Sequence, residues 1–307
     1  MMADPVVSIV VPVFNGARTI AACLESLLRQ DYPADRREIL VVDNDSTDGT
    51  ADFVQRYPVT LLRETQTRGP AAARNRALPQ ARGAFVAFTD ADCLAEKNWL
   101  TQALAGFDSE RIGCVAGEIR SPEPTTTAQR YATARRLLSQ RQALQESFRP
   151  YAQTANAVFR RQVLERLGGF DASLPTGEDA DLAWRMQEDL GLEITFQEAA
   201  VVYHQHRERV RELLRQRVGY GYGSVLLYRK HRARMGAHTL KHTWWEWRSL
   251  GRKLGRLCRA LGRRLLWWSR PAPEAESVRM VGLEILVFLA QKLGQLQGSI
   301  RHRVWYV

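Results

Sequence analysis

The sequence predicts an α/β fold in which helices flank a mostly parallel sheet, followed by an amphipathic helical extension. Short apolar runs alternate with segments of helical length over the first 118 residues. The chain has 307 residues, of which 45% are hydrophobic and 25% charged, enough for one large or two ordinary domains with a packed core. This composition excludes intrinsically disordered, collagen-like and small disulfide-rich proteins.

Five short, mostly β-branched runs are typical of strands that are buried on both faces. They are Val6–Val13, Ile39–Val42, Val59–Leu62, Ala84–Phe88 and Ile112–Ala116. Four segments between them are long enough for helices: Ala17–Arg29, Thr50–Tyr57, Pro70–Ala81 and Glu96–Phe107. Strands and helices that alternate in this order predict a parallel sheet covered by helices.

The middle of the chain mixes both kinds of element. The Pro- and Thr-rich segment Ser121–Thr127 predicts a loop, and Ala128–Ser147 predicts one helix. Further on, we expect helices at Gln162–Leu167 and Glu178–Leu190 and a turn at Gly168-Gly169. The apolar or strand-like pieces in this region are Ala157–Phe159, Glu193–Phe196 and Ala199–Tyr203.

The last third of the chain differs from the rest in charge. Residues 1–206 hold 22 Lys and Arg against 27 Asp and Glu, whereas residues 207–307 hold 22 against 6, together with six of the eight tryptophans. Apolar residues recur every three or four positions from Leu240 to Trp268, so they form one stripe on a helix whose other faces carry Lys and Arg. Pro271 and Pro273 end this helix, and a more apolar helix follows to about Gln297.

Cysteine usage and hydropathy bear on the compartment. The four cysteines lie far apart without a CxxC pair, which predicts neither a zinc knuckle nor a disulfide framework and favours a reducing compartment. The run Val6–Val13 lacks the features of a secretory signal, and Val278–Ala290 is shorter than the roughly 20 residues that span a bilayer. We therefore expect a cytoplasmic protein without a transmembrane helix.

Carboxylates follow the strand predicted at Ala84–Phe88, at the edge where ligands bind in open α/β sheets. Asp90 and Asp92 on an extended loop could hold Mg²⁺ or Mn²⁺, which take oxygen ligands, or they could cap the helix that begins near Glu96. At the same edge, Asp43 follows the second strand and could bind a ribose or a base, whereas Asp48 is better explained by a turn. Asp179 at a helix start could act as a general base or simply as a cap.

Six motifs occur in order along the chain. They are Val11–Asn15 (Val-Pro-x-Phe-Asn), Val42–Thr50 (Val-Asp-Asn-x-Ser-Thr-Asp-Gly-Thr), Ala73–Asn75 (Ala-Arg-Asn), Asp90–Asp92 (Asp-x-Asp), Gly168–Asp171 (Gly-Gly-Phe-Asp) and Gly177–Arg185 (Gly-Glu-Asp-x-Asp-Leu-x-x-Arg). Together they resemble the family 2 glycosyltransferases, which have the GT-A (Rossmann-like) fold. The resemblance covers about residues 6–206 and implies that sugars are transferred from nucleotide diphosphate sugars.

The resemblance also implies roles for individual residues. The residues that would bind the nucleotide sugar are Pro12, Asn15, Asp43, Arg74, Asp90 and Asn156. Asp92 would coordinate Mg²⁺ or Mn²⁺, and Asp179 would be the catalytic base. His204 is the first choice for a histidine metal ligand and His206 the second, although two surface histidines in a loop explain this pair about as well.

The resemblance predicts two domains, and the sequence differs from the family pattern at a few positions. A GT-A domain would span 1–235, with a nucleotide-binding half (1–118) and an acceptor half (119–235), and a basic aromatic tail would span 236–307. Asn44 and Thr67 stand where many relatives carry Asp and Asn, which leaves open which base and sugar are bound. The Gln-x-x-Arg-Trp signature of processive synthases is also absent.

These features predict a metal-assisted, inverting glycosyltransferase that acts on a lipid-linked or cell-surface glycan. The segment 240–297 is expected to lie on the inner face of the cell membrane, or instead to pack on the enzyme's own core or on a twin subunit. One alternative is a sugar-nucleotide nucleotidyltransferase, although its early Gly-rich basic loop is poorly matched by Asn15–Arg18. Another is a non-enzymatic basic protein that binds membranes or nucleic acid, but no RNA-binding signature occurs, so we expect no nucleic-acid partner.

Overall fold

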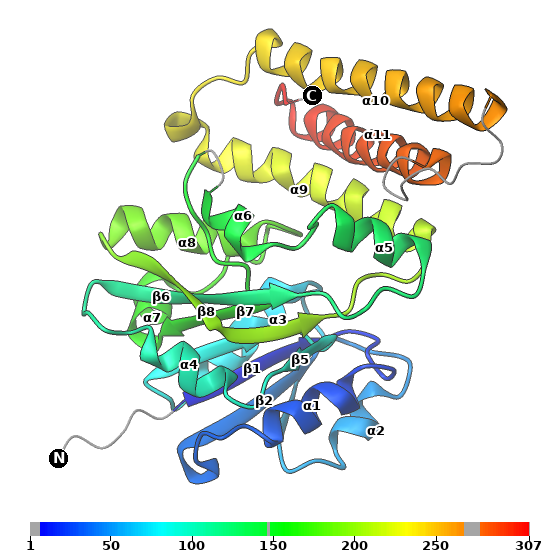
Figure 1. Cartoon of the computed structure of the whole chain (residues 1–307). Helices are drawn as coiled ribbons and strands as arrows, with labels where there is room; N and C mark the ends of the chain where they lie inside the picture. Colours follow the sequence, from blue (N-terminus) through cyan, green and yellow to red (C-terminus); the bar gives the residue numbers. More distant parts are fainter. Residues whose placement is uncertain (1–6, 146–147, 267–276, 307) are drawn as a thin grey trace. The chain divides into compact units, whose positions relative to one another are not determined.

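The computed structural model describes residues 7–145, 148–266 and 277–306 (Figure 1). The chain divides into two compact units, which we call the sheet unit (Met1–Pro122 and Leu138–Gln205) and the helical unit (Glu123–Leu137 and His206–Val307). This division differs from the boundary predicted after residue 235, which stays a prediction.

The sheet unit is built on one eight-stranded mixed sheet with the strand order β3-β2-β1-β4-β7-β6-β8-β5. The strands are β1 (Val7–Val13), β2 (Arg37–Asp43), β3 (Thr60–Arg63), β4 (Phe85–Thr89), β5 (Cys93–Ala95), β6 (Ile112–Arg120), β7 (Asn156–Arg160) and β8 (Glu193–His204). Four neighbouring pairs are parallel, and the pairs β4–β7, β6–β7 and β5–β8 are antiparallel. The five predicted strands are all present, and β1 to β4 are joined by three of the four parallel pairs.

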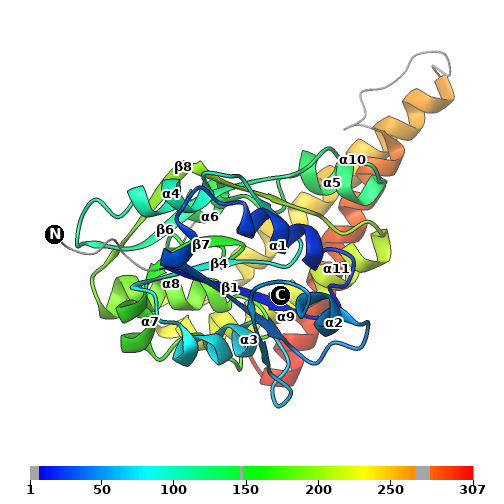
Figure 2. The same ribbon diagram turned by 90° about the horizontal axis from the view of Figure 1, so that it is seen from below.

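Helices cover both faces of this sheet, as Figure 2 shows. The helices of the sheet unit are α1 (Ile20–Leu28), α2 (Thr50–Val54), α3 (Pro70–Ala77), α4 (Trp99–Ala105), α6 (Gln140–Gln145), α7 (Arg161–Leu167) and α8 (Glu178–Asp189), with short 3₁₀ turns at η1 (Ala34–Arg36) and η2 (Leu78–Gln80). Side chains of α1, α2 and α4 pack into the core on one face, and those of α3, α7 and α8 pack into the core on the other. Successive strand residues point to opposite faces, so β1 contributes Ile9 and Val10 to different cores. The predicted α/β class is confirmed.

Two local predictions were wrong, and one strand was missed. The single helix expected over 128–147 is divided, because Arg136 adopts a left-handed φ of 48° after α5 (Thr127–Ala134); residues 146 and 147 lie outside the described chain. The two segments expected within 193–203 form one strand, β8, with a register shift opposite Gly117 and Glu118. Gly117 permits this irregularity, because a Cβ there would lie 2.4 Å from the Ala200 carbonyl oxygen. The strand β5 was not predicted.

The helical unit consists of α5, α9 (Val210–Met235), α10 (Leu240–Leu266) and α11 (Val278–His302). Helix α5 begins with a capping box formed by Thr126 and Gln129. Helices α9 and α11 approach closely at glycines: a Cβ on Gly221 would lie 2.0 Å from the Gln291 carbonyl oxygen, and one on Gly294 would lie 1.9 Å from that of Val218. Only residues without a side chain allow two backbones this close.

The two predicted helices of the last third are both present, whereas α9 was not predicted. The stripe expected from Leu240 to Trp268 lies on α10 as far as Leu266, and its last position lies outside the described residues. Helix α11 continues past the expected end at Gln297 to His302. Within the described ranges, none of the helices combines the length and the apolar character that crossing a membrane requires.

Candidate active site

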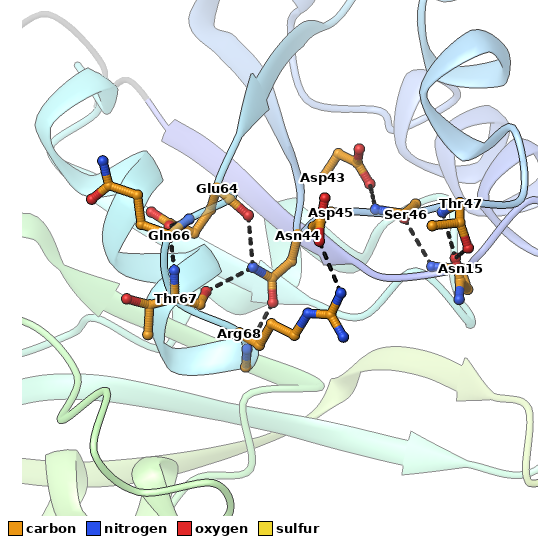
Figure 3. Close-up of polar contacts among 11 residues, drawn as sticks. Asn15, Asp43, Asn44, Asp45, Ser46, Thr47, Glu64, Gln66, Thr67 and Arg68 are labelled. Atoms are coloured by element: carbon orange, nitrogen blue, oxygen red, sulfur yellow. Dashed lines mark hydrogen bonds and ion pairs between the residues drawn. The ribbon is translucent and has the colours of Figure 1, made fainter.

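The first two strands of the sheet end side by side, because their parallel register pairs Val13 with Asp43. Beyond them, the N–H of Asn15 donates to Ser46 Oγ (2.8 Å), and Asn15 Oδ1 accepts a hydrogen bond from the N–H of Thr47 (2.8 Å), as Figure 3 shows. Asp43 is buried, and its Oδ1 accepts a hydrogen bond from the Ser46 N–H at 3.2 Å. The two loops are thereby fixed to each other, and Asp43 and Asn15 lie together at one edge of the sheet.

Asn44 ties this edge to the loop that follows β3 (Figure 3). Its Nδ2 donates to the carbonyl oxygens of Glu64 (2.9 Å) and Thr67 (2.8 Å), and its Oδ1 accepts a hydrogen bond from the N–H of Gly69 (2.7 Å). An ionised Asp could not donate the first two bonds, so the asparagine at this position matches its partners. The departure from the family pattern at Asn44 therefore has a local structural reason.

Asp90, Asp92 and His204 converge beyond the end of β4. Strand β5 follows the two aspartates and pairs with β8 so that Cys93 lies opposite His204. One carboxylate oxygen from each aspartate and one imidazole nitrogen lie within 4.8 Å of one another, and His204 Nε2 is 3.4 Å from Asp92 Oδ1. All three side chains are partly exposed, and two carboxylates with one imidazole suit a divalent ion that is also open to substrate. Of the two predicted histidines, His204 is the one in this group.

Two buried thiols report the charge of this region. Burial raises the pKa of the Cys23 thiol, and the negative charges of Asp92 and Asp90 raise it further. Burial and the same two aspartates also raise the pKa of Cys93. Both thiols therefore stay protonated. A bound cation would reduce the negative electrostatic potential that the two aspartates produce at this edge of the sheet.

Arg74 on α3 connects the Asp90 end of this group to helix α8. Its guanidinium forms ion pairs with Asp90 (2.9 Å) and Glu178 (2.8 Å), and the arginine side chain is 3% exposed. The guanidinium also lies 5.6 Å from the centre of the Phe170 ring. The predicted residue Arg74 is therefore at the site, but it is covered and its ion pairs hold two carboxylates in place.

Asn75 explains two further motifs. Its Nδ2 donates to the Phe170 carbonyl oxygen (2.7 Å), and its Oδ1 accepts from the Phe170 N–H (2.8 Å). Gly169 has a φ of 75°, and a Cβ there would lie 2.5 Å from Asn75 Oδ1. The Ala-Arg-Asn and Gly-Gly-Phe-Asp motifs are thus joined by two hydrogen bonds, which hold the Phe170 ring beside Arg74.

Asp179 lies in the first turn of α8, which begins after Gly177 with a φ of 86°. Burial raises the pKa of the Asp179 carboxyl from its usual 3.8 to about 7; Glu178 also raises this pKa, whereas Arg74 lowers it. A carboxylate whose pKa is near neutral pH is suited to accept a proton from a hydroxyl group. Asp181, in the same turn, is fully buried and pairs with Arg185 (2.9 Å), which in turn donates to the carbonyl oxygens of Leu167 and Gly169.

The two other predicted donor contacts, Pro12 and Asn156, differ in exposure. Pro12 is half-buried in β1, opposite Val42. Asn156 is fully buried, and its side chain accepts from Trp99 Nε1 (2.7 Å) and donates to the carbonyl oxygens of Glu118 and Ala200 (both 2.8 Å). With no exposed surface, Asn156 joins strands and a helix instead of facing a donor in this conformation.

Sequence reasoning missed the roles of Glu178 and Phe170. Both lie inside motifs that were recognised, but a motif shows neither that Glu178 pairs with Arg74, which is 104 residues away, nor that Phe170 lies under the guanidinium. The position of Glu178 directly before the candidate base Asp179 was the one sequence feature that could have indicated its role.

Comparisons with known proteins agree with this geometry. Residues 8–168, slightly more than half of the chain, match the profile of the family described as Glycosyl transferase family 2. The glycosyltransferase AglE of Haloferax volcanii is 31% identical over 234 residues, which cover 73% of this chain and 74% of that protein. The pre-mycofactocin glycosyltransferase of Mycobacterium tuberculosis is 32% identical over 268 residues, which cover 82% of this chain but 54% of that protein.

A solved structure supports the fold. The mannosyltransferase PcManGT from Pyrobaculum calidifontis, in complex with GDP-Man and Mn²⁺, has a TM-score of 0.59 at 24% identity and covers 97% of this chain and 74% of its own. The shared sheet and its flanking helices confirm the expected GT-A-like architecture. Because the family profile matches more than half of the chain and the similarity to AglE covers most of both proteins, we conclude that the chain belongs to glycosyltransferase family 2.

Proposed function

We propose that this glycosyltransferase moves a sugar, with inversion at the anomeric carbon, from a nucleotide diphosphate sugar to a hydroxyl group of a lipid-linked or cell-surface glycan. The observation that carries the proposal is the Arg74 bridge. It joins Asp90, a member of the candidate metal group, to Glu178, which directly precedes the candidate base. This bridge supports one site for the proposed metal ligands and the proposed base, as a reaction at one anomeric carbon requires.

Asp92, His204 and Asp90 are the residues that would hold Mg²⁺ or Mn²⁺. Their oxygen and nitrogen donors lie within 4.8 Å of one another, and the surrounding carboxylates favour a cation. The similar mannosyltransferase structure was solved with Mn²⁺. When bound, such an ion stabilises negative charge on a leaving diphosphate.

Asp179 would accept the proton of the acceptor hydroxyl as that oxygen attacks the anomeric carbon. A pKa of about 7 lets a substantial fraction of Asp179 be ionised at neutral pH while it remains basic enough to take the proton. General-base assistance of this kind contributes about 10²- to 10⁴-fold in rate. Attack from the side opposite the diphosphate gives inversion.

The nucleotide would lie at the ends of β1 and β2, along Pro12, Asn15 and Asp43. Asp43 is fixed by the Ser46 N–H and is suited to accept hydrogen bonds from a base. Arg74 would act on the diphosphate site by positioning Asp90. Asn156 is left out of the proposed donor contacts because it is fully buried.

The acceptor class and the location rest on the helical unit. Residues 207–307 carry 22 Lys and Arg against 6 Asp and Glu, and exposed tryptophans occur on α10. A basic amphipathic helix binds anionic membrane surfaces, with about 1 kcal/mol per basic residue near the lipid. This favours a peripheral protein at the inner face of the cell membrane that takes part in cell-envelope glycan synthesis.

The test is the change Asp179→Asn, with Asp189→Asn at the exposed end of the same helix as the matched control. A panel of nucleotide diphosphate sugars is assayed for transfer, and the anomeric configuration of the product is read by NMR. We expect Asp179→Asn to lose transfer while its nucleotide diphosphate affinity is unchanged, and Asp189→Asn to behave as wild type. Full transfer by Asp179→Asn would refute the base assignment, and a product with retained configuration would refute inversion.

A further inference from the structure

An open groove of about 720 Å³ runs along α10, which lies beside α11 in the helical unit (Figure 1). Glu284 of α11 is the one carboxylate among the residues that line the groove. The lining includes five cationic side chains, all from α10: Arg248, Arg252, Lys253, Arg256 and Arg259. The groove therefore carries a large excess of positive charge.

Four of these cations form one row, which we call the arginine row: Arg248, Arg252, Arg256 and Arg259. They follow one another at spacings of four, four and three residues, so they lie on one face of α10. Like charges at these spacings repel each other and destabilise a helix. A bound anion would offset this repulsion.

The single carboxylate of the groove does not balance the arginine row. Oε2 of Glu284 accepts hydrogen bonds from Arg256 and from Arg135 of α5, so one oxygen is shared between two cations. Burial lowers the pKa of Lys253; Glu284 opposes this shift, and the neighbouring arginines add to it. The cations around Glu284 thus outnumber the negative charge that they share.

The other helices of this unit add positive charge in the same region. Burial raises the pKa of the Tyr131 hydroxyl on α5, Glu284 raises it further, and three cations lower it: Arg135, Arg217 and Arg256. Arg217 comes from α9, and its Nε is buried without a hydrogen-bond partner among the described residues. All four helices of the unit therefore contribute a charged side chain to a region that holds one carboxylate.

The groove has open space beside the arginine row, and its lining is not apolar. Gly251 and Gly255 are lining residues, and a Cβ on Gly251 would meet nothing within 4 Å. The exposed Leu254 and Leu261 of α10 each follow an arginine of the row by two residues, which puts them roughly 160° around the helix from it. The apolar stripe of α10 therefore faces away from the groove, which is suited to a charged group and not to hydrocarbon.

We propose that this groove is a binding site for a phosphate or diphosphate group of an anionic ligand. Guanidinium groups bind phosphate oxygens through paired hydrogen bonds, and four of the five groove cations are arginines. Five cations against one carboxylate favour a ligand with two or more negative charges. The row spans roughly 16 Å along the helix axis, which is long enough for a diphosphate. The inference goes beyond the proposed function, because it concerns the helical unit alone.

The first test removes charge from the arginine row. Binding of inorganic pyrophosphate to the full-length chain is measured by isothermal titration calorimetry in a metal-free chloride buffer. The row variant is Arg248→Gln/Arg252→Gln/Arg259→Gln, and the matched control Arg211→Gln/Arg215→Gln/Arg232→Gln removes three exposed cations from α9. We expect the row variant to bind on the order of 100-fold more weakly, since each unit charge at about 4 Å in water contributes roughly fivefold, and the control to lose less than about threefold. No binding by wild type, or equal losses in the two variants, would overturn the proposal.

The second test removes the one negative charge of the groove. Glu284→Gln should bind pyrophosphate roughly fivefold more tightly than wild type, because an anion no longer meets a like charge beside the cations. Glu212→Gln on α9 is the matched control and should bind as wild type does. Unchanged or weaker binding by folded Glu284→Gln would contradict an anion site. The row variant changes exposed side chains only, so it keeps the proposal testable if the loss of Glu284 impairs folding.

A competition measurement identifies the source of the phosphate group. Wild type is sedimented with phosphatidylcholine vesicles that contain phosphatidylglycerol, with and without pyrophosphate at constant ionic strength. Release from the vesicles by pyrophosphate supports a lipid headgroup as the source, and unchanged sedimentation supports a soluble phosphate compound. Loss of single-stranded RNA binding in the row variant, with pyrophosphate binding unchanged, would identify a nucleic acid and overturn the proposal. None of these measurements contains a sugar donor, so they do not depend on the chemistry proposed for Asp179.

Discussion

Replacing Arg74 with Met tests whether the buried bridge holds the site together. Arg74 is 3% exposed and pairs at 2.8 Å with Glu178, whose side chain is 7% exposed, and at 2.9 Å with Asp90. Removing one partner of a buried ion pair leaves an uncompensated charge and costs about 3–5 kcal/mol. For a domain of 150–250 residues this corresponds to a fall in Tm of roughly 6–20 °C. Thermal and urea unfolding at pH 7.5 measure it.

Arg68 provides the matched control for this change. It pairs with Asp45 at the same 2.9 Å, but the two side chains are 71% and 45% exposed. An exposed pair contributes about 0–1 kcal/mol, so Arg68→Met should hardly change the unfolding free energy. The double variant Arg74→Met/Glu178→Gln should recover part of the loss, because the orphaned carboxylate is then neutral. Equal losses for Arg74→Met and Arg68→Met would show that burial of the bridge has no energetic role.

Three further predictions concern titration, helix packing and the sheet interior. Because the pKa of Asp179 is raised in the folded state, its contribution to stability is fully present below about pH 4 and is lost as the pH rises through about 7. The Tm of Asp179→Asn should therefore match that of wild type near pH 4 and be higher than that of wild type at pH 8. A lower Tm of the variant at pH 8 would contradict this. Gly294→Ala places a Cβ 1.9 Å from the Val218 carbonyl oxygen and should lower the free energy of urea unfolding by about 1–3 kcal/mol. The control Gly251→Ala meets nothing within 4 Å and should raise this free energy by up to about 1 kcal/mol. The reverse order would refute the close packing of α9 and α11. Asn156→Ala leaves the Trp99 N–H without its hydrogen-bond acceptor and should lower the free energy of unfolding by about 1–3 kcal/mol in the same assay. The KM of the folded protein for the donor should be unchanged. A raised KM without loss of stability would instead support Asn156 as a donor contact.

The parallel half of the sheet could be predicted because its strands are buried on both faces and therefore consist of continuous apolar runs. Val7–Val13 and Phe85–Thr89 were found within one residue of their ends. The carboxylates of Asp43 and Asp90 then follow from the rule that the ends of parallel strands share one edge. Their convergence needed no knowledge of distant contacts.

Features that depend on long-range contacts could not be predicted. The strand β5 has three residues and is defined by its pairing with β8, a partner more than 100 residues away. The end of α5 depends on the left-handed conformation of Arg136, which is unusual for that residue type and carries no sequence signal. Asn156 was predicted from the resemblance alone, and its burial among Trp99, Glu118 and Ala200 depends on contacts at least 38 residues away in the sequence.

The most direct measurement of the central claim is a thermal-shift panel of nucleotide diphosphates with and without Mn²⁺ or Mg²⁺. The wild type, Asp92→Ala and the exposed control Asp108→Ala are compared. A ligand present at 100 times its Kd stabilises the folded state by about 2.7 kcal/mol, which such a scan detects readily. We expect at least one nucleotide diphosphate to raise the Tm of wild type and Asp108→Ala only when the metal ion is present, and not to raise that of Asp92→Ala. The same metal-dependent rise in Asp92→Ala would contradict the assignment of the ion and the diphosphate to this site.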